Sequence, residues 1–280
     1  MSVEWRFLEH PAFRVFDATV RERLVALDHF PHPGELARLA EGIPRAIAPW
    51  FEFAPQTRPS LQGLGGFDRV IAETSRIPTR PDSFHDLLGA LVWLHYPALK
   101  TAIHCAQVGG NSRARRPSEN AATHFDESGV LVLSCDTAIF ELLAGFRWRE
   151  AFWERRVELA RTTRFIAFGH GLLDSLRDPH PRLMGKAFFV HVDAACLDLS
   201  TAELRVLIDR SLAPELAAFL SEPARLQPLP VLGIPGWSAL QTPVFYDDAR
   251  YFRTERQHAR PRTEGFGVVR LAHGASLKRR

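Results

Sequence analysis

The longest apolar pattern in the chain runs from Pro81 to Tyr96, and its spacing predicts a largely buried helix. Ser83 suits the N-cap and Asp86 stands three residues later, so the two predict a capping box. Pro97 ends the helix, because the residue before a proline is pushed out of the α region. The apolar positions of this helix are Leu87, Leu88, Leu91, Val92 and Leu94.

Helical spacing of apolar residues recurs through the rest of the chain. Ser200 and Glu203 form a second predicted capping box, which opens a helix with a one-sided apolar stripe. The other predicted helices cover Pro33–Glu41, a segment from Pro97 that carries Lys100 and His104, Thr137–Leu143, Arg147–Arg161 and Gly171–Leu176.

Short apolar runs bounded by turn residues predict a few strands. The segment Ala121–Ser134 has turn chemistry at Asp126–Gly129 followed by an apolar run, which is typical of a hairpin. The remaining strands are predicted over Phe67–Glu73, Phe165–Phe168 and Ala187–Val192.

The segments between these elements complete the predicted architecture. Pro49–Gly66 is expected to be an irregular connector, and Pro228–Trp237 is too rich in proline for a helix or a central strand. The latter is predicted to be an ordered wrapping loop that docks Trp237, and residues 254–280 to be a basic, partly disordered tail. Together the pattern predicts one α+β domain over residues 1–280, mixed and mainly helical, with a small sheet and a proline-rich C-terminal wrapping segment.

Composition places the chain among ordinary globular proteins. It has 280 residues, of which 46% are hydrophobic and 24% charged, and no apolar run is long enough for a membrane helix. The N-terminus lacks an apolar signal segment. Cys105, Cys135 and Cys196 are far apart, so they favour a reduced cytoplasm over disulfides and offer no zinc-binding pair.

Arginine dominates the basic residues, because only three of the 35 are lysines. Arginine suits bidentate binding of phosphate or carboxylate, although a G+C-rich genome would produce the same bias. The formal net charge of +3 gives no strong field toward nucleic acid. Arg113, Arg115 and Arg116 lie in a polar stretch from Gly109 to Pro117, which is either a solvated loop or an anion clamp over a neighbouring pocket.

Three histidines stand out as candidates for chemistry. His124 and Asp126 are two residues apart on the predicted strand, so they would share a face and could bind a metal or act as a general base. The alternative is that Asp126 simply begins the turn. His85 stands at the N-terminus of the central helix, where the helix dipole disfavours an imidazolium, so it could serve as a neutral ligand or base.

His170 follows an apolar strand and precedes a helix, between Gly169 and Gly171. Strand ends at helix N-termini are common places for catalytic groups, and flanking glycines let a substrate or another backbone approach closely. The alternative is a core histidine with its hydrogen bonds satisfied. Asp247 and Asp248 form the remaining acidic pair, which fits a solvated turn with an arginine ion pair.

Five stretches, in the same order along the chain, resemble a bacterial family known as domain of unknown function 3025. They are RIPTRPDSFHDLLGALVWLHYP, ATHFDESG, FGHGLL, PLPVLGIPGW and FYDDARYFR, and the resemblance covers about residues 67–253. It implies a bacterial, cytoplasmic, single-domain protein and no particular reaction. The chain departs from the family at Gly89, His104 and Gln107, where the family more often has Asn, Asn and His.

Two functions from different classes fit these observations. The first is a metal-assisted or acid–base hydrolase of a small anionic, phosphate-containing substrate, with a divalent metal ion held by His85, His124, Asp126 and His170. The second is a non-catalytic module that binds nucleic acid or an acidic partner through the Arg113–Arg116 segment and the basic tail. The first requires the histidines to meet in one cleft beside the central helix.

Overall fold

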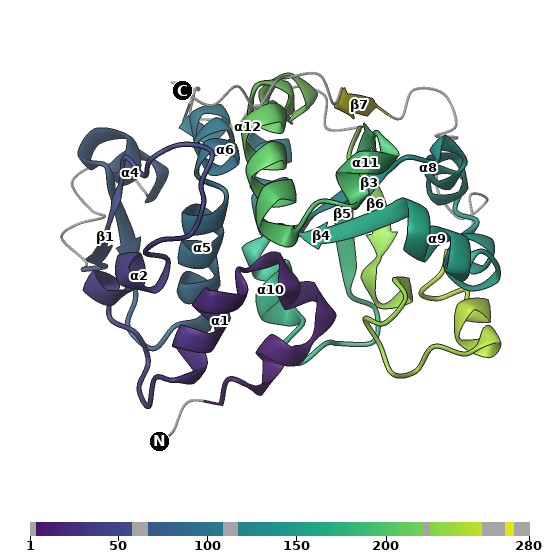
Figure 1. Cartoon of the computed structure of the whole chain (residues 1–280), viewed down its shortest axis with the longest axis horizontal. Helices are drawn as coiled ribbons and strands as arrows, with labels where there is room; N and C mark the ends of the chain where they lie inside the picture. The colour runs from purple at the N-terminus through teal and green to yellow at the C-terminus, as the bar shows by residue number, and fades with distance from the viewer. Residues whose placement is uncertain (1–3, 58–66, 109–116, 221–224, 254–266, 272–280) are drawn as a thin grey trace.

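A mixed β-sheet forms one side of the molecule, and helices separate it from a smaller sheet (Figure 1). The computed structural model describes residues 4–57, 67–108, 117–220, 225–253 and 267–271. Its α-helices are α1 (Ala18–Val25), α2 (Pro33–Leu39), α4 (Phe67–Thr74), α5 (Phe84–His95), α6 (Pro97–Val108), α7 (Pro117–Ser128), α8 (Thr137–Ala144), α9 (Arg156–Thr162), α10 (His170–Ser175), α11 (Ala194–Leu197) and α12 (Thr201–Leu220). Short helical turns are η1 (Arg6–Glu9), η2 (Pro11–Val15), η3 (Glu150–Glu154), η5 (Val231–Gly233) and η6 (Pro243–Asp247).

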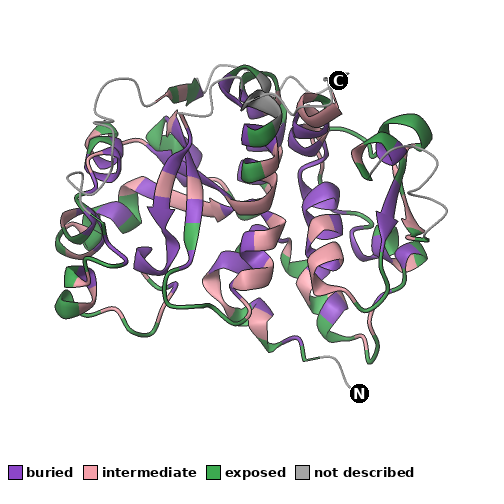
Figure 2. Ribbon diagram, turned by 180° about the vertical axis from the view of Figure 1, so that it is seen from behind, coloured by how far each residue is buried: buried purple, intermediate pink, exposed green. Residues whose placement is uncertain are grey.

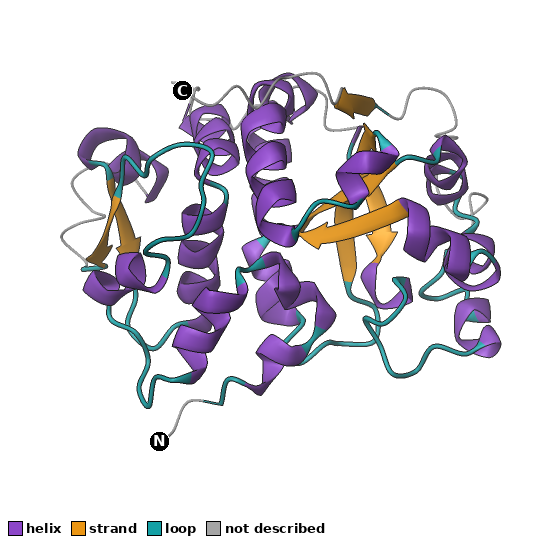
Figure 3. Ribbon diagram, in the orientation of Figure 1, coloured by secondary structure: helices purple, strands orange, loops and turns teal. Residues whose placement is uncertain are grey.

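The larger sheet has the strand order β4-β3-β5-β6, with β7 also paired to β5 (Figure 3). Its strands are β3 (Gly129–Ser134), β4 (Thr163–Ala167), β5 (Met184–Val192), β6 (Gln227–Pro230) and β7 (Val268–Leu271). β3 pairs with β4 antiparallel and with β5 parallel. Every residue of β3 is buried, because helices cover a central strand on both faces, and its sequence is accordingly almost continuously apolar.

One continuous cluster of buried residues runs from Trp5 to Leu271 and joins the sheet to the helices (Figure 2). Within it α12 packs along α6, and α10 packs against both α5 and α7. The predicted α+β class is therefore confirmed, with many helices around a small mixed sheet. The central helix is confirmed as α5. Its first turn is partly open, and its residues from Leu87 to His95 are all buried except Gly89.

The smaller sheet pairs β1 (Glu52–Pro55) with β2 (Arg76–Thr79) in parallel. β1 lies within Pro49–Gly66, where the sequence predicted an irregular connector, so that prediction is wrong for Glu52–Pro55. The predicted strand Phe67–Glu73 is also wrong, since the segment is helix α4. Phe67, Val70 and Ile71 stand at i, i+3 and i+4, which is helical spacing, and Val70 and Ile71 are the buried pair.

The predicted hairpin over Ala121–Ser134 is wrong as well. Residues up to Ser128 continue helix α7, and only Gly129 onward forms a strand. The turn chemistry at Asp126–Gly129 therefore marks the end of a helix and not a strand-to-strand turn. Gly129 is required there, because a Cβ would lie within 2.8 Å of the Phe125 ring.

Of the two predicted capping boxes, the one at Ser200 is confirmed, and the one at Ser83 forms only one of its two hydrogen bonds. Ser200 and Glu203 exchange both hydrogen bonds, at 3.0 and 3.3 Å. Ser83 Oγ accepts from the Asp86 backbone N–H at 3.2 Å, but the Asp86 carboxylate accepts from the backbone and side chain of Arg80 instead of returning to Ser83.

The remaining comparisons between prediction and structure concern the chain from Arg147 onward. The predicted helix Arg147–Arg161 breaks at Arg155 into the π-helical turn η3 and helix α9. Pro228–Trp237 starts within β6, which is an edge strand and so tolerates proline, and Trp237 docks as predicted with 5% of its surface exposed. In the predicted disordered tail, Val268–Leu271 forms β7, while residues 254–266 and 272–280 lie outside the described residues.

Candidate metal centre

A cavity of about 260 Å³ opens where the N-terminal parts of α5 and α10 meet the C-terminal end of α7. Its wall contains the imidazole rings of His85 and His170, together with carboxylates from α7. The full lining is Gln56, Phe67, Asp68, Ile77, Pro78, Thr79, Arg80, His85, Asp86, Gly89, Ala90, Trp93, Lys100, Gln107, Thr123, Asp126, Glu127 and His170.

Helix α7 decides which of its side chains reach this cavity. Thr123, Asp126 and Glu127 line it, at i, i+3 and i+4 on one helical face. His124 is exposed and lies outside the cavity's lining, because residues two apart on a helix point in different directions. The argument that His124 and Asp126 share a face is therefore wrong, since it depended on a strand.

His170 enters the cavity as the first residue of α10, and only Phe168 and Gly169 separate it from the end of β4. Its Nδ1 lies 2.8 Å from the backbone carbonyl oxygen of Asp126, which can only accept a hydrogen bond. Nδ1 therefore carries the proton in the neutral ring, and Nε2 keeps its lone pair for a metal or a proton. Burial lowers the pKa of His170, although the nearby Asp126 carboxylate opposes the shift, so the neutral ring is favoured.

The two glycines beside His170 let α7 come close enough to form the site. A Cβ on Gly169 would lie 2.5 Å from the backbone nitrogens of Ser128 and Gly129. A Cβ on Gly171 would overlap the Glu127 carboxylate itself. The glycines therefore admit a neighbouring backbone at one position and a carboxylate side chain at the other.

His85 faces His170 from the first turn of α5, with ring centroids 4.5 Å apart. Gly89 lies one turn further along α5, where even a Cβ would be 3.5 Å from the His170 ring. Nδ1 of His85 lies 3.9 Å from Oδ2 of Asp174, which also forms an ion pair with Arg177 at 2.9 Å. Asp174 therefore lies beside His85.

His85, Glu127 and His170, which we term the candidate triad, offer ligand atoms that all lie within 4.8 Å of one another. Nε2 of His170 is 3.6 Å from Oε1 of Glu127. Ligand atoms on one tetrahedral zinc ion are about 3.4 Å apart, given bonds of roughly 2.1 Å. Small side-chain rotations would bring the triad onto one ion, and Glu127 is free to rotate because 47% of its side chain is exposed.

Asp126 has a different partner from the one predicted. Its carboxylate forms a buried ion pair with Lys100 from α6, and the Lys100 ammonium lies 5.0 Å above the Trp93 ring. Burial disfavours the Asp126 anion, but Lys100 and then His170 outweigh it, so the pKa of Asp126 is lowered. Gln107 also donates a hydrogen bond to this carboxylate. Asp126 therefore anchors Lys100 and positions His170 through its carbonyl oxygen.

Glu127, Lys100 and Gln107 are the site residues that sequence reasoning missed. Glu127 was assigned to the hairpin turn. A helical assignment would have placed it on the same face as Thr123 and Asp126. Lys100 and Gln107 are seven residues apart, two helical turns, so one face of α6 delivers both to Asp126. Arg113, Arg115 and Arg116, the predicted anion clamp, lie outside the described residues.

Two other histidines belong to the core. Nε2 of His95 accepts from the Asp17 backbone N–H at 2.9 Å, and its Nδ1 lies 2.7 Å from the Leu91 carbonyl oxygen, so both ring nitrogens are satisfied. His104 is also buried, and burial together with Lys100 lowers its pKa to about 4. Asp247 and Asp248 pair with arginines on the surface, as the sequence indicated.

Comparison with known proteins assigns the chain to a protein family. The model of a family described as a protein of unknown function (DUF3025) matches residues 51–256, which include the whole candidate triad. Neither the curated proteins nor the solved structures provide a match. In the described part of the chain, no helix combines the length and apolar character that crossing a membrane requires. The match covers well over half of the sequence, and the chain therefore belongs to the DUF3025 family of proteins of unknown function.

Proposed function

We propose that this protein is a metal-assisted hydrolase that acts on a phosphate ester, with a divalent ion held by His85, Glu127 and His170. The observation that carries the proposal is the convergence of two imidazoles and one carboxylate from three separate helices. Two neutral imidazoles and one carboxylate are a ligand set that catalytic zinc uses, and three protein ligands leave a position open for water.

The bound ion would supply a nucleophile at neutral pH, because a divalent metal lowers the pKa of its water to about 7. In the proposed reaction a water oxygen would bond to phosphorus, the ester P–O bond would break, and the departing alkoxide would take up the proton. The products are a phosphate and an alcohol. Such hydrolysis needs no redox partner.

The protein's own groups would hold the ligands and the substrate in place. The Asp126 carbonyl oxygen fixes the tautomer of His170, which leaves Nε2 toward Glu127. Lys100 is the buried cation of the cavity, and it would stabilise negative charge that develops on the phosphoryl oxygens. Phe67 is 43% exposed at the cavity, and it would contact the organic part of the ester.

The proposal is tested by hydrolysis of bis(p-nitrophenyl) phosphate and p-nitrophenyl phosphate by the full chain supplied with Zn²⁺ or Mn²⁺. We expect activity in the native protein that falls at least 100-fold in His170→Ala and Glu127→Gln. His124→Ala is the matched control, because His124 is exposed on the same helix as Glu127 and should keep native activity. Equal activity in His170→Ala and the native protein would refute the proposal.

A further inference from the structure

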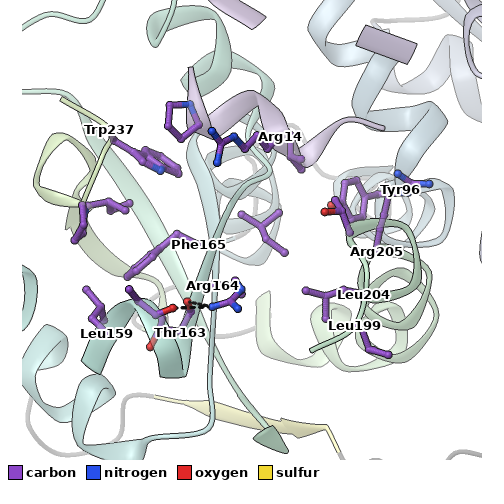
Figure 4. A pocket seen from close by; sticks show the side chains of 17 residues that line it. Arg14, Tyr96, Leu159, Thr163, Arg164, Phe165, Leu199, Leu204, Arg205 and Trp237 are labelled. Carbon is purple, nitrogen blue, oxygen red and sulfur yellow. Dashed lines mark hydrogen bonds between the residues drawn. The ribbon is translucent and has the colours of Figure 1, made fainter. Parts of the chain in front are cut away.

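A second cavity, of about 440 Å³, lies between η2, strand β4, the first turn of α12 and the segment around Trp237 (Figure 4). It shares no lining residue with the cavity of the candidate triad. Its volume falls in the range of roughly 300–1,000 Å³ that small-molecule sites occupy. We term it the cationic cavity, for the reason that follows.

Among the described residues, three arginines and no carboxylate line the cationic cavity. They are Arg14 from η2, Arg164 from β4 and Arg205 from α12, and in Figure 4 Arg14 and Arg164 reach the same open space from opposite sides. Cations on low-dielectric walls, without carboxylates among the lining residues, concentrate a positive potential. An organic cation or a neutral sugar would not benefit from such a wall, whereas an anion would.

Arg205 has a donor that the described part of the protein leaves unused. The residue is 1% exposed, and its terminal nitrogens bond to the Asp17 carboxylate and the Pro44 carbonyl oxygen. Its Nε is buried and has no hydrogen-bond partner among the described residues. A buried donor without an acceptor is costly, and Arg205 is also one of the residues that line the cavity.

Arg14 supplies the accessible half of the same site. It is exposed, and no ion pair or hydrogen bond holds its guanidinium within the described residues. A free guanidinium fork matches a carboxylate or phosphate in a bidentate manner. Arg164 differs, because its terminal nitrogens donate to the carbonyl oxygens of Ala160, Thr163 and Leu197. It therefore contributes positive charge to the cavity but few free hydrogen-bond donors.

The rest of the wall is apolar. Phe165 and Trp237 face the cavity on one side and Leu204 on the other (Figure 4). We propose that the cationic cavity binds a small organic anion, whose single carboxylate or phosphate head group lies between Arg14 and Arg205 and whose apolar body lies on Phe165 and Trp237. This site is independent of the proposed hydrolase.

The proposal is tested with the full chain and the fluorescent anion 1-anilinonaphthalene-8-sulfonate, displaced by octanoate, octyl phosphate or 1-octanol. We expect saturable binding that octanoate or octyl phosphate displaces and that 1-octanol, at the same concentration, does not. The more effective competitor identifies the head group. Displacement by 1-octanol as effective as by the anions would overturn the proposal, and so would the absence of binding at millimolar concentrations.

Two variants locate the binding. Arg14→Gln should weaken it at least fivefold, whereas Arg6→Gln, which removes an exposed arginine from η1 outside the cavity, should not. Ala160→Trp fills the exposed rim of the cavity and should abolish binding although all three arginines remain in the sequence. Equal affinity in Arg14→Gln and Arg6→Gln, or native affinity in Ala160→Trp, would overturn the proposal. All three variants should retain native metal content, which separates this test from that of the hydrolase.

Discussion

At the scale of single residues, the candidate triad depends on two glycines, whose missing side chains leave room for their neighbours. Gly171 leaves room for the Glu127 carboxylate, and Gly169 leaves room for the backbone of α7. In the sequence, the Gly-His-Gly motif already indicated that a substrate or another backbone segment comes close to His170. The approaching group could not be identified, because that required the helical assignment of α7.

Alanine at these glycines should therefore have different effects. Gly171→Ala should displace the flexible Glu127 carboxylate and weaken metal affinity about 10- to 100-fold, the usual effect of disturbing a group that positions a ligand. Gly169→Ala should destabilise the fold, because its Cβ meets backbone that cannot move away. Isothermal titration with Zn²⁺ and the thermal midpoint separate the two effects.

Gly89→Ala is the control for both, since its Cβ would make only ordinary contact with the His170 ring at 3.5 Å. We expect native metal affinity and a native thermal midpoint in this variant. A loss of affinity in Gly89→Ala equal to that in Gly171→Ala would contradict the assignment of Glu127 as a ligand.

At the scale of elements, the sequence predicts best where the apolar period is long. The starts of helices α5, α6, α8 and α12 were predicted within a few residues, because their apolar spacing and caps agree. Helix α7 was missed, because AATHFDES contains few apolar residues and ends in residues that also favour turns. That single error removed Glu127 from the predicted site and placed His124 in it.

The ion pair between Lys100 and Asp126 joins α6 to α7 beside the triad. Lys100→Met would leave a buried carboxylate without its cation, so we expect the free energy of unfolding to fall by about 3 kcal/mol. The double variant Lys100→Met/Asp126→Asn should recover part of that loss. Urea denaturation measures both values.

The exposed ion pair of Arg76 with Glu52 provides the comparison, since 62% of each side chain is exposed. Arg76→Met should cost less than about 1 kcal/mol. If Lys100→Met cost no more than Arg76→Met, the Lys100 pair would not be buried as described.

His95 connects α5 to the N-terminus of α1 and should make stability depend on pH. Burial and then the charge of Arg205 lower the pKa of His95 to about 3, from an ordinary value of 6.5. Between these values the unfolded chain binds the proton and the native state does not, so stability falls as the pH falls from about 6.5 toward 3. The thermal midpoint measured from pH 7.5 to pH 4 reports this fall.

In His95→Gln the fall should be shallower, because the group that titrates only on unfolding is gone. Comparing slopes and not midpoints removes the constant cost of the lost hydrogen bonds. His124→Gln, at an exposed histidine, is the control. Identical slopes in His95→Gln and the native protein would show that His95 is not held neutral by burial.

At the scale of the whole molecule, α5 connects the two sheets. Most of its buried residues belong to the core that runs from Trp5 to Leu271, while Trp93 packs with Ile71 of α4 and Ile77 of the smaller sheet. The same helix carries His85 at its start and His95 at its end. The sequence identified α5 as the central element, but periodicity alone could not show which distant segments pack against it.

This shared helix leads us to expect one cooperative unfolding transition, as predicted for a single domain. Tryptophans are spread over both regions, for example Trp93 near the smaller sheet and Trp148 near the larger one. Tryptophan fluorescence and far-ultraviolet circular dichroism should therefore report the same thermal midpoint. Two separate midpoints would indicate that the smaller sheet unfolds on its own.

The most direct test of the candidate metal centre is elemental analysis of the full chain purified without chelators. The account predicts close to one transition metal ion per chain in the native protein and in His124→Ala, and far less in His85→Ala, Glu127→Gln and His170→Ala. A metal-free native protein whose thermal midpoint does not change on addition of Zn²⁺ or Mn²⁺ would contradict it.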